Sequence, residues 1–402
     1  MKTITDQKRI DEIFARGTVV EILPSTEAFV AKLMSGDVIK IYIGVDPNAE
    51  ALHLGHAKNI MFLEELRQLG HEVILLMGDF TAQIGDPDKK STRPQLTQEV
   101  TASNAAKWLD QVKPILNFTD KENPAKIMYN SEWLSKLTLV EIADIASNFT
   151  VQQMIERDMF EKRIKEGNPI YLHEFMYPLM QGYDSVAMNV DAELCGTDQI
   201  FNALAGRTLL KRYKNKEKFV VALNLVANPK TGELMSKSKR TGVFINLPAD
   251  ELFGAIMALP DPMIEPLFIN CTRIPLEDKD ALMATGPREA KARVAFDIVK
   301  RFHGEEAAVQ AERSFNETFS KGRVPEDIQE VRISAATSAG TALADTLVKA
   351  GIVPSKTEWR RLVGDGAVRQ EDDTKITDPN FMPASTVVLK IGKRRFVKVV
   401  VV

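Results

Sequence analysis

Short apolar runs alternate with amphipathic stretches over roughly the first 248 residues of the chain. The alternating run 38–45 predicts a strand, and the stretch 54–69, ended by Gly70, predicts a helix. Residues 73–77 are apolar throughout, as in strands buried inside a parallel sheet. Further short strands are predicted at 191–194 and 220–225. This alternation predicts an α/β fold, a Rossmann-like, doubly wound parallel sheet whose ligand lies at the carboxyl ends of the strands.

The other segments suggest how the chain is divided into domains. Residues 1–37 and roughly 96–187 are expected to be helical, and both would belong to a first domain over 1–248. Residues 249–325 contain no strand candidate and predict a second, helical domain. A polar linker is expected at 326–340.

The last part, 341–402, predicts a small α+β domain. A first helix is expected at 341–349, and Ser355 with Glu358 forms a capping-box pattern that would begin a second helix. Two strands are expected at the end of the chain, at 386–391 and 396–401.

Charge is distributed unevenly along the 402 residues, whose net charge is −3. Residues 341–402 hold 11 Lys plus Arg against 7 Asp plus Glu. A basic end on an acidic body favours an anionic partner such as nucleic acid, although a solvated charged face is an equal alternative. Two cysteines, no apolar signal core and no run of 18 apolar residues favour a cytoplasmic protein without a membrane partner.

Two histidines flank a glycine where the first strand gives way to the first helix. After Gly44 the strand breaks at Pro47, and His53, Gly55 and His56 stand at the start of the helix. Backbone N–H groups and the helix dipole bind phosphate at such a terminus, and a glycine lets a bulky group approach. The arrangement favours a nucleoside triphosphate, with solvated or metal-binding histidines as the alternative.

A polar loop follows the strand predicted at 220–225. Within it Lys237 is a long cation flanked by Ser236 and Ser238, and such a group can reach a pyrophosphate as charge develops there. Taken alone, a loop of this composition is usually plain surface. Its position after the histidine pair favours the phosphate role.

Three polar residues share one face of a predicted helix near 176–188. Spacings of four and three bring Tyr177, Gln181 and Asp184 together. A mixed polar surface is the alternative, but the apolar neighbours indicate partial burial, and buried polar groups need partners.

Together these motifs resemble class I aminoacyl-tRNA synthetases. The histidine pair is similar to the HIGH signature and the later loop to KMSKS, with Leu234 in place of the first lysine. Over nearly its full length the chain resembles bacterial tyrosyl-tRNA synthetases. The resemblance implies activation of L-tyrosine by ATP with magnesium and transfer of tyrosine to tRNA(Tyr). The catalytic residues would be His53, His56 and Lys237, without a permanent cofactor.

The resemblance also implies binding residues. Asp184 and Tyr42 would bind the substrate phenol, while Tyr177, Gln181 and Asp86 would hold its other end. The implied tyrosine-binding residues are Tyr42, Asp86, Tyr177, Gln181, Asp184 and Gln199. The implied ATP-binding residues are Gly44, Asp46, His53, Gly55, His56, Gly196, Asp198, Met235, Ser236, Lys237 and Ser238. No protein metal site is expected.

Assembly and RNA binding follow from the same resemblance. An insertion at about 130–180, with Asn130 and Trp133 near the subunit interface, would form a homodimer. The helical 249–325 domain would bind the anticodon arm. The end of the chain resembles an RNA-binding domain of the ribosomal S-four type, with these candidate RNA-binding residues: Lys356, Arg360, Arg361, Lys393, Arg394 and Arg395.

Two alternatives remain open at this stage. A tryptophanyl-tRNA synthetase is the sibling enzyme, against which Asp184, Tyr42 and the C-terminal domain count. A non-catalytic RNA-binding relative is the other, favoured by Leu234 and opposed by the retained histidine, lysine and pocket residues.

Overall fold

The computed structural model describes residues 3–86, 96–235, 242–320, 329–333, 342–370, 374–383, 385–392 and 395–401. The chain divides into two compact units, Met1–Ala311 and Glu312–Val402, which are described separately. Five of the candidate site residues lie outside the described residues: Ser236, Lys237 and Ser238 of the later loop, and Lys393 and Arg394 of the basic turn.

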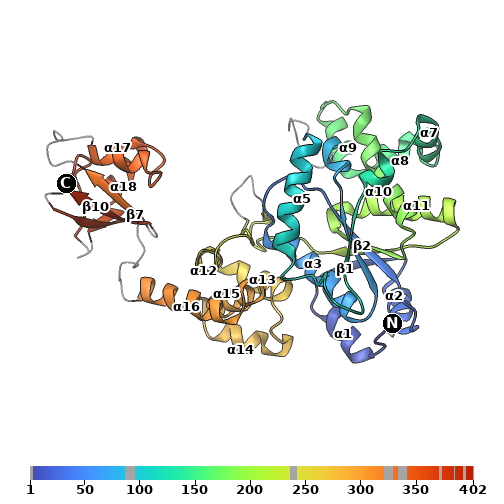
Figure 1. Cartoon of the computed structure of the whole chain (residues 1–402), viewed down its shortest axis with the longest axis horizontal. Coiled ribbons are helices and arrows are strands. Elements are labelled where there is room, and N and C mark those ends of the chain that lie inside the picture. The colour runs from blue at the N-terminus through green and yellow to red at the C-terminus, as the bar shows by residue number, and fades with distance from the viewer. Residues whose placement is uncertain are drawn as a thin grey trace. The chain divides into compact units, whose positions relative to one another are not determined.

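A six-stranded sheet forms the centre of the first unit, in the order β1-β6-β5-β2-β3-β4 (Figure 1). Strands β2 to β6 run parallel to one another, and β1 pairs antiparallel with β6 at one edge. The strands are β1 Val19–Leu23, β2 Lys40–Val45, β3 Glu72–Met77, β4 Lys126–Tyr129, β5 Ala192–Gly196 and β6 Phe219–Leu223. Strands β2, β3, β5 and β6 confirm the sequence predictions.

Both edge strands were wrongly assigned from the sequence. Strand β1 lies in a segment expected to be helical, and β4 lies within the predicted helical stretch 96–187. The two strands are five and four residues long and are largely exposed or half-buried. Their extended conformation comes from pairing with β6 and β3, which leaves little trace in a local apolar pattern.

Helices follow the strands and cover the sheet (Figure 1). A Cβ atom at Gly182 would lie 3.1 Å from the backbone of residues 205 and 206, so α10 and α11 cross closely. The α-helices up to β6 are α1 Gln7–Ala15, α2 Thr26–Met34, α3 Leu54–Gln68, α4 Thr81–Ile84, α5 Gln98–Val112, α6 Ser131–Leu134, α7 Leu139–Ala146, α8 Val151–Ile155, α9 Asp158–Lys165, α10 Met176–Met188 and α11 Ile200–Lys214.

Among the described residues of the first unit, the regular elements after β6 are helices. These are α12 Ala249–Met257, α13 Ile264–Cys271, α14 Lys279–Ala284 and α15 Pro287–His303, while α16 Glu305–Ser320 crosses the unit boundary. The Arg16 guanidinium donates to the carbonyl oxygens of Phe268, Ile269 and Ile274, which ties the N-terminal segment to the end of α13. Among the described residues no single helix could span a membrane, although α12 and Asp261–Cys271, bent by 114°, pass together on length and composition.

The second unit contains a four-stranded sheet in the order β7-β10-β9-β8, with helices α17 Ala342–Lys349 and α18 Lys356–Gly364 (Figure 1). Its strands are β7 Gln329–Ile333, β8 Val368–Gln370, β9 Val387–Ile391 and β10 Arg395–Val401. Trp359 and Leu347 pack with Val397 and Val399 in its core. The predicted linker 326–340 is wrong over β7, because that strand pairs in parallel with β10.

Candidate active site

The histidine pair lies where the chain leaves β2 and enters α3. His53 is the N-cap of α3, and its Nδ1 accepts from the Gly55 backbone N–H at 3.1 Å. Nδ1 of His56 accepts from the His53 N–H at 3.4 Å, and the two ring centroids are 3.8 Å apart. Because each Nδ1 is an acceptor, a neutral ring carries its proton on Nε2. Both imidazoles are therefore N–H donors on their other edge, which suits an anionic ligand.

Two glycines shape this end of the sheet in different ways. A Cβ atom on Gly55 would lie 2.9 Å from Cε1 of His53, so glycine keeps the imidazole in place. Approach of a ligand to the backbone at Gly55, the role expected from the sequence, stays a prediction. Gly44 lies in the central strand β2 and is nevertheless exposed, and a Cβ atom there would make only ordinary contacts, at 3.9 Å, with Leu76 and Tyr42.

The described flanks of the later polar loop contact the histidine segment. The Leu54 N–H donates to the Val243 carbonyl at 3.0 Å, and the Ile245 N–H donates to the Leu52 carbonyl at 3.0 Å. A Cβ atom on Gly242 would lie 3.4 Å from Cβ of His53. The chain therefore returns from the loop directly beside the histidines. Lys237 itself lies outside the described residues.

The three polar residues predicted on one helix face lie on α10. Asp184 is 2% exposed and accepts from Trp133 Nε1 at 2.7 Å and from Asn130 Nδ2 at 3.3 Å. The Tyr42 hydroxyl is fully buried, and it lies 3.0 Å from Oγ of Ser185, the neighbour of Asp184. The structure therefore brings Tyr42 and Asp184 to one wall of the site.

Asn130 and Trp133 have contacts that the sequence interpretation missed. Both side chains donate to Asp184, while their expected place near a subunit interface stays a prediction. They come from α6 and the residue before it, far from α10 in sequence. In the sequence, only the indole N–H of Trp133 and the side-chain amide of Asn130 indicated that these residues could donate to a buried acceptor.

Burial controls the protonation of this wall. It raises the pKa of Tyr42 well above its usual value, and the nearby Glu193 and Asp184 carboxylates raise it further. Burial likewise raises the pKa of Asp184, while the N–H groups of Trp133 and Asn130 act in the opposite direction. Tyr42 therefore stays a protonated phenol that can donate a hydrogen bond.

A chain of amide and carboxylate side chains extends from this wall. Gln199 donates to Asp86 at 2.8 Å, and Asn202 donates to Gln199 at 2.7 Å and to Gln181 at 3.0 Å. Gln181 then donates to Glu193 at 2.8 Å. The predicted residues Asp86, Gln181 and Gln199 are thus brought together. Asn202 and Glu193 were missed, because no local pattern distinguishes them.

Asp46 is held from two sides. Its Oδ2 accepts from the Tyr177 hydroxyl at 2.8 Å and its Oδ1 from the Thr81 hydroxyl at 2.7 Å. The two predicted residues Asp46 and Tyr177 therefore meet directly, at the end of β2 that carries Gly44. Binding of ATP by Asp46 stays a prediction.

The turn after β5 brings a further acid to the site. A Cβ atom on Gly196 would lie 2.4 Å from Oδ1 of Asp198, so any side chain there would displace the Asp198 carboxylate. Lys58, which the sequence analysis missed, is 1% exposed on α3. Burial lowers its pKa to about 8, and the attraction of Asp198 partly offsets this lowering.

Met235, the last described residue before the later polar loop, is buried, and its N–H donates to the Val226 carbonyl at 3.0 Å.

Sequence comparisons supply the family of the protein. The family model described as tRNA synthetases class I (W and Y) matches residues 34–320. The chain is 41% identical to the tyrosine–tRNA ligase of Carboxydothermus hydrogenoformans over 99% of each chain. It is 40% identical to that of Moorella thermoacetica over 96% of this chain and 94% of the relative. The chain belongs to the tyrosine–tRNA ligase family.

Solved structures share the fold of this family member. The C-terminally truncated mitochondrial tyrosyl-tRNA synthetase of Aspergillus nidulans gives a TM-score of 0.66 at 21% identity, covering 78% of this chain and 95% of that one. The Archaeoglobus fulgidus tyrosyl-tRNA synthetase, complexed with L-tyrosine, gives 0.58 at 19% identity, covering 76% and 99%. The predicted α/β fold class is confirmed.

The C-terminal unit of this family member exposes three of the candidate RNA-binding residues on α18. Lys356, Arg360 and Arg361 are exposed. Lys356 pairs with Asp345 at 2.6 Å, and Arg361 pairs with Glu358 at 2.8 Å. Such exposed pairs are weak, so both cations can exchange their partners for phosphate. RNA binding by these residues stays a prediction.

Arg395 has a structural contact in this unit. Its guanidinium donates to the Ile352 carbonyl at 2.6 Å and so links β10 to the turn after α17. Lys393 and Arg394 lie outside the described residues.

Proposed function

We propose that the chain activates L-tyrosine with ATP and transfers the tyrosyl group to tRNA(Tyr). The observation that carries this proposal is the wall formed by Asp184 and Tyr42. A buried carboxylate held by two N–H donors lies beside a buried phenol, and the phenol is on β2, the strand that leads to the histidine pair. Family membership supports the same reaction.

The first step joins the tyrosine carboxylate to the α-phosphorus of ATP, which is bound with its magnesium as the substrate complex. One carboxylate oxygen forms the new P–O bond as the bond to pyrophosphate breaks. No side chain needs to act as a nucleophile. His53, His56 and Lys237 would stabilise the negative charge that develops on the phosphates, and binding at the helix terminus would position them.

The second step moves the tyrosyl group to RNA. A hydroxyl of the terminal ribose of tRNA attacks the adenylate carbonyl, and AMP leaves with the electron pair of the broken bond. In this proposal the 249–325 helical domain holds the anticodon arm, and the basic residues of the last unit hold RNA phosphates. Contacts of this kind position RNA rather than read its bases.

Selectivity for tyrosine follows from the same wall. Phenylalanine would leave the Asp184 carboxylate and the Tyr42 hydroxyl facing an apolar ring edge. A buried group that loses its partner costs about 1–3 kcal/mol. Tyrosine is therefore preferred through binding alone.

ATP–pyrophosphate exchange with tyrosine, tryptophan or phenylalanine tests the proposed function. Exchange that depends on tyrosine is expected. Exchange with tryptophan alone would identify the sibling enzyme of the family, and no exchange with any of the three would leave a non-catalytic RNA-binding protein.

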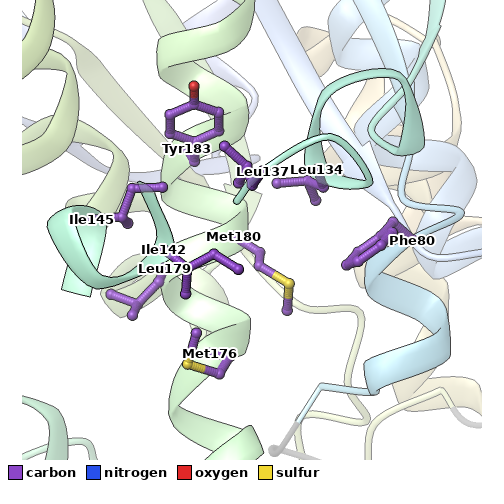
Figure 2. A pocket seen from close by; sticks show the side chains of 9 residues that line it. All are labelled: Phe80, Leu134, Leu137, Ile142, Ile145, Met176, Leu179, Met180 and Tyr183. Atoms are coloured by element: carbon purple, nitrogen blue, oxygen red, sulfur yellow. The ribbon is translucent and has the colours of Figure 1, made fainter. Parts of the chain in front are cut away.

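We also propose that the protein acts as a cytoplasmic homodimer paired through the segment 130–180. Leu139, Val140 and Leu172 are 81%, 79% and 83% exposed there. Figure 2 shows an apolar pocket lined largely by residues of the same part of the chain, with side chains from α10 and from the α6–α7 segment around one hollow. It is lined by Phe80, Leu134, Leu137, Ile142, Ile145, Met176, Leu179, Met180 and Tyr183. Exposed apolar surface of this extent favours a protein partner.

Light scattering during size-exclusion chromatography tests the homodimer. The wild type is expected to elute at twice the chain mass, and Leu139→Glu is expected to shift it to the monomer. Val309→Glu is the matched control, because Val309 is also an exposed aliphatic residue, at 53%, but lies on α16. A monomeric wild type would contradict the proposal.

A further inference from the structure

A buried lysine lies behind the tyrosine pocket. Lys218, immediately before β6, is 0% exposed, and its ammonium forms an ion pair with Glu193 of β5, itself 1% exposed. The same ammonium donates to Oγ of Ser185 at 2.9 Å. A buried ion pair contributes little net stability, because desolvation opposes the attraction. Net stability therefore does not explain this ion pair, and the other contacts of Lys218 and Glu193 indicate a functional role.

The surrounding helices leave room for this ammonium. A Cβ atom on Gly206 of α11 would lie 2.5 Å from Nζ of Lys218 and 2.6 Å from Oγ of Ser185. Any larger residue at position 206 would displace the lysine or the serine. The close crossing of α10 and α11 thus has a space that the Lys218 ammonium fills.

The first contact leads from Lys218 to the phenol end of the pocket. Ser185 accepts from the ammonium, and its hydroxyl lies 3.0 Å from that of Tyr42. A hydroxyl that accepts from a cation becomes a better donor. Ser185 is thereby directed to donate to the Tyr42 oxygen, which leaves the Tyr42 proton for another acceptor. The Nζ atom also lies 5.8 Å from the Tyr42 ring centroid.

The second contact leads to the other end of the pocket. Glu193 holds Lys218 with one carboxylate oxygen and accepts from Gln181 Nε2 at 2.8 Å with the other. The Gln181 carbonyl oxygen accepts from Asn202 at 3.0 Å. Because its NH₂ group donates to Glu193 and its oxygen accepts from Asn202, the Gln181 amide cannot be flipped without losing both hydrogen bonds. Without its cation, Glu193 would be an uncompensated buried charge and would lose this geometry.

We propose that Lys218 is a positioning residue for the tyrosine pocket. It directs the Tyr42 hydroxyl through Ser185 and orients the Gln181 amide through Glu193. The inference rests on the proposed function, since it concerns how tyrosine is held. One buried cation thus sets the geometry at both ends of the amino-acid substrate.

Steady-state ATP–pyrophosphate exchange of Lys218→Met tests this role, with tyrosine, phenylalanine and ATP each varied. Methionine keeps the length of the side chain and removes the charge. The KM for tyrosine is expected to rise by about 5- to 150-fold, with the KM for ATP nearly unchanged, since lost hydrogen bonds in the pocket are worth about 1–3 kcal/mol. The preference for tyrosine over phenylalanine is expected to fall.

Two further variants separate the two contacts and guard against misfolding. Ser185→Ala is expected to reduce the tyrosine preference with a smaller effect on KM. Lys218→Met combined with Glu193→Gln removes both charges and keeps an acceptor for Gln181, so the Tm and most of the KM should recover while the preference stays reduced. Lys216→Met is the matched control, because Lys216 pairs with Asp191 at 2.8 Å outside the pocket.

Two results would overturn the role of Lys218. One is a lowered Tm in Lys218→Met with wild-type KM and tyrosine preference, which would make the lysine a packing residue. The other is a wild-type preference in both Ser185→Ala and the double variant. Failure of the wild type to exchange with tyrosine would instead contradict the proposed function, so the two failures are distinguishable.

Discussion

Replacing Asp184 by asparagine removes the acidic group of the pocket while keeping its shape. Asp184 is 2% exposed and accepts from Trp133 Nε1 at 2.7 Å and Asn130 Nδ2 at 3.3 Å. An asparagine oxygen can accept from one of these donors, but its NH₂ group then meets the other donor or the substrate phenol. The variant therefore loses acceptor capacity where the structure concentrates donors.

The magnitude follows from the lost hydrogen bond. An unmade bond in a buried site costs about 1–3 kcal/mol, which corresponds to about a 5- to 150-fold fall in kcat/KM for tyrosine. Phenylalanine has no hydroxyl, so it has no such bond to lose and its kcat/KM should change little. The ratio of the two kcat/KM values should fall by the same factor.

ATP–pyrophosphate exchange with each amino acid measures this ratio, and thermal unfolding checks that the variant is folded. Asp110→Asn is the matched control, because Asp110 is an exposed acid paired with Lys113. Trp133→Phe, which removes one donor to Asp184, should reduce the ratio less. An unchanged ratio in a folded Asp184→Asn protein would refute the assignment of this carboxylate to the substrate phenol.

Three further predictions follow. Gly55→Ala should lower kcat and raise the KM for ATP but not for tyrosine, because the Cβ atom of the alanine would lie 2.9 Å from the His53 ring. Wild-type kinetics of this variant would contradict the proposal that Gly55 leaves room for the His53 imidazole. Lys237→Ala should lower kcat by about a hundred-fold or more with little change in tyrosine affinity, and loss of tyrosine affinity alone would argue against its phosphate role. Burial lowers the pKa of His71 from 6.5 to about 4. The unfolded chain therefore binds the proton at a higher pH than the folded chain, and about 3 kcal/mol of stability should be lost as pH falls from 6.5 to 4. Urea unfolding measures this loss, and the free energy of unfolding of His71→Leu should depend less steeply on pH than that of the wild type. An equally steep dependence would exclude His71 as the cause.

Much of the candidate site could be anticipated because its motifs are local. The histidine pair follows a strand and begins a helix, and that junction can be predicted from the pattern of a dozen residues. The spacing of Tyr177, Gln181 and Asp184 likewise fixes a common helix face. The edge strands β1 and β4 could not be predicted in this way, since they are short and depend on partners distant in sequence.

The sequence by itself determined the parallel α/β sheet, the strand-to-helix junction at His53 and the polar face of α10, because periodicity and helix spacing act over neighbouring residues. Only the tertiary structure decided that Trp133 and Asn130 hold Asp184, and that Lys218 lies behind Tyr42. Those partners come from separate strands and helices, and burial alone makes their hydrogen bonds obligatory. No pattern along one segment can encode which distant polar group will satisfy a buried carboxylate or phenol.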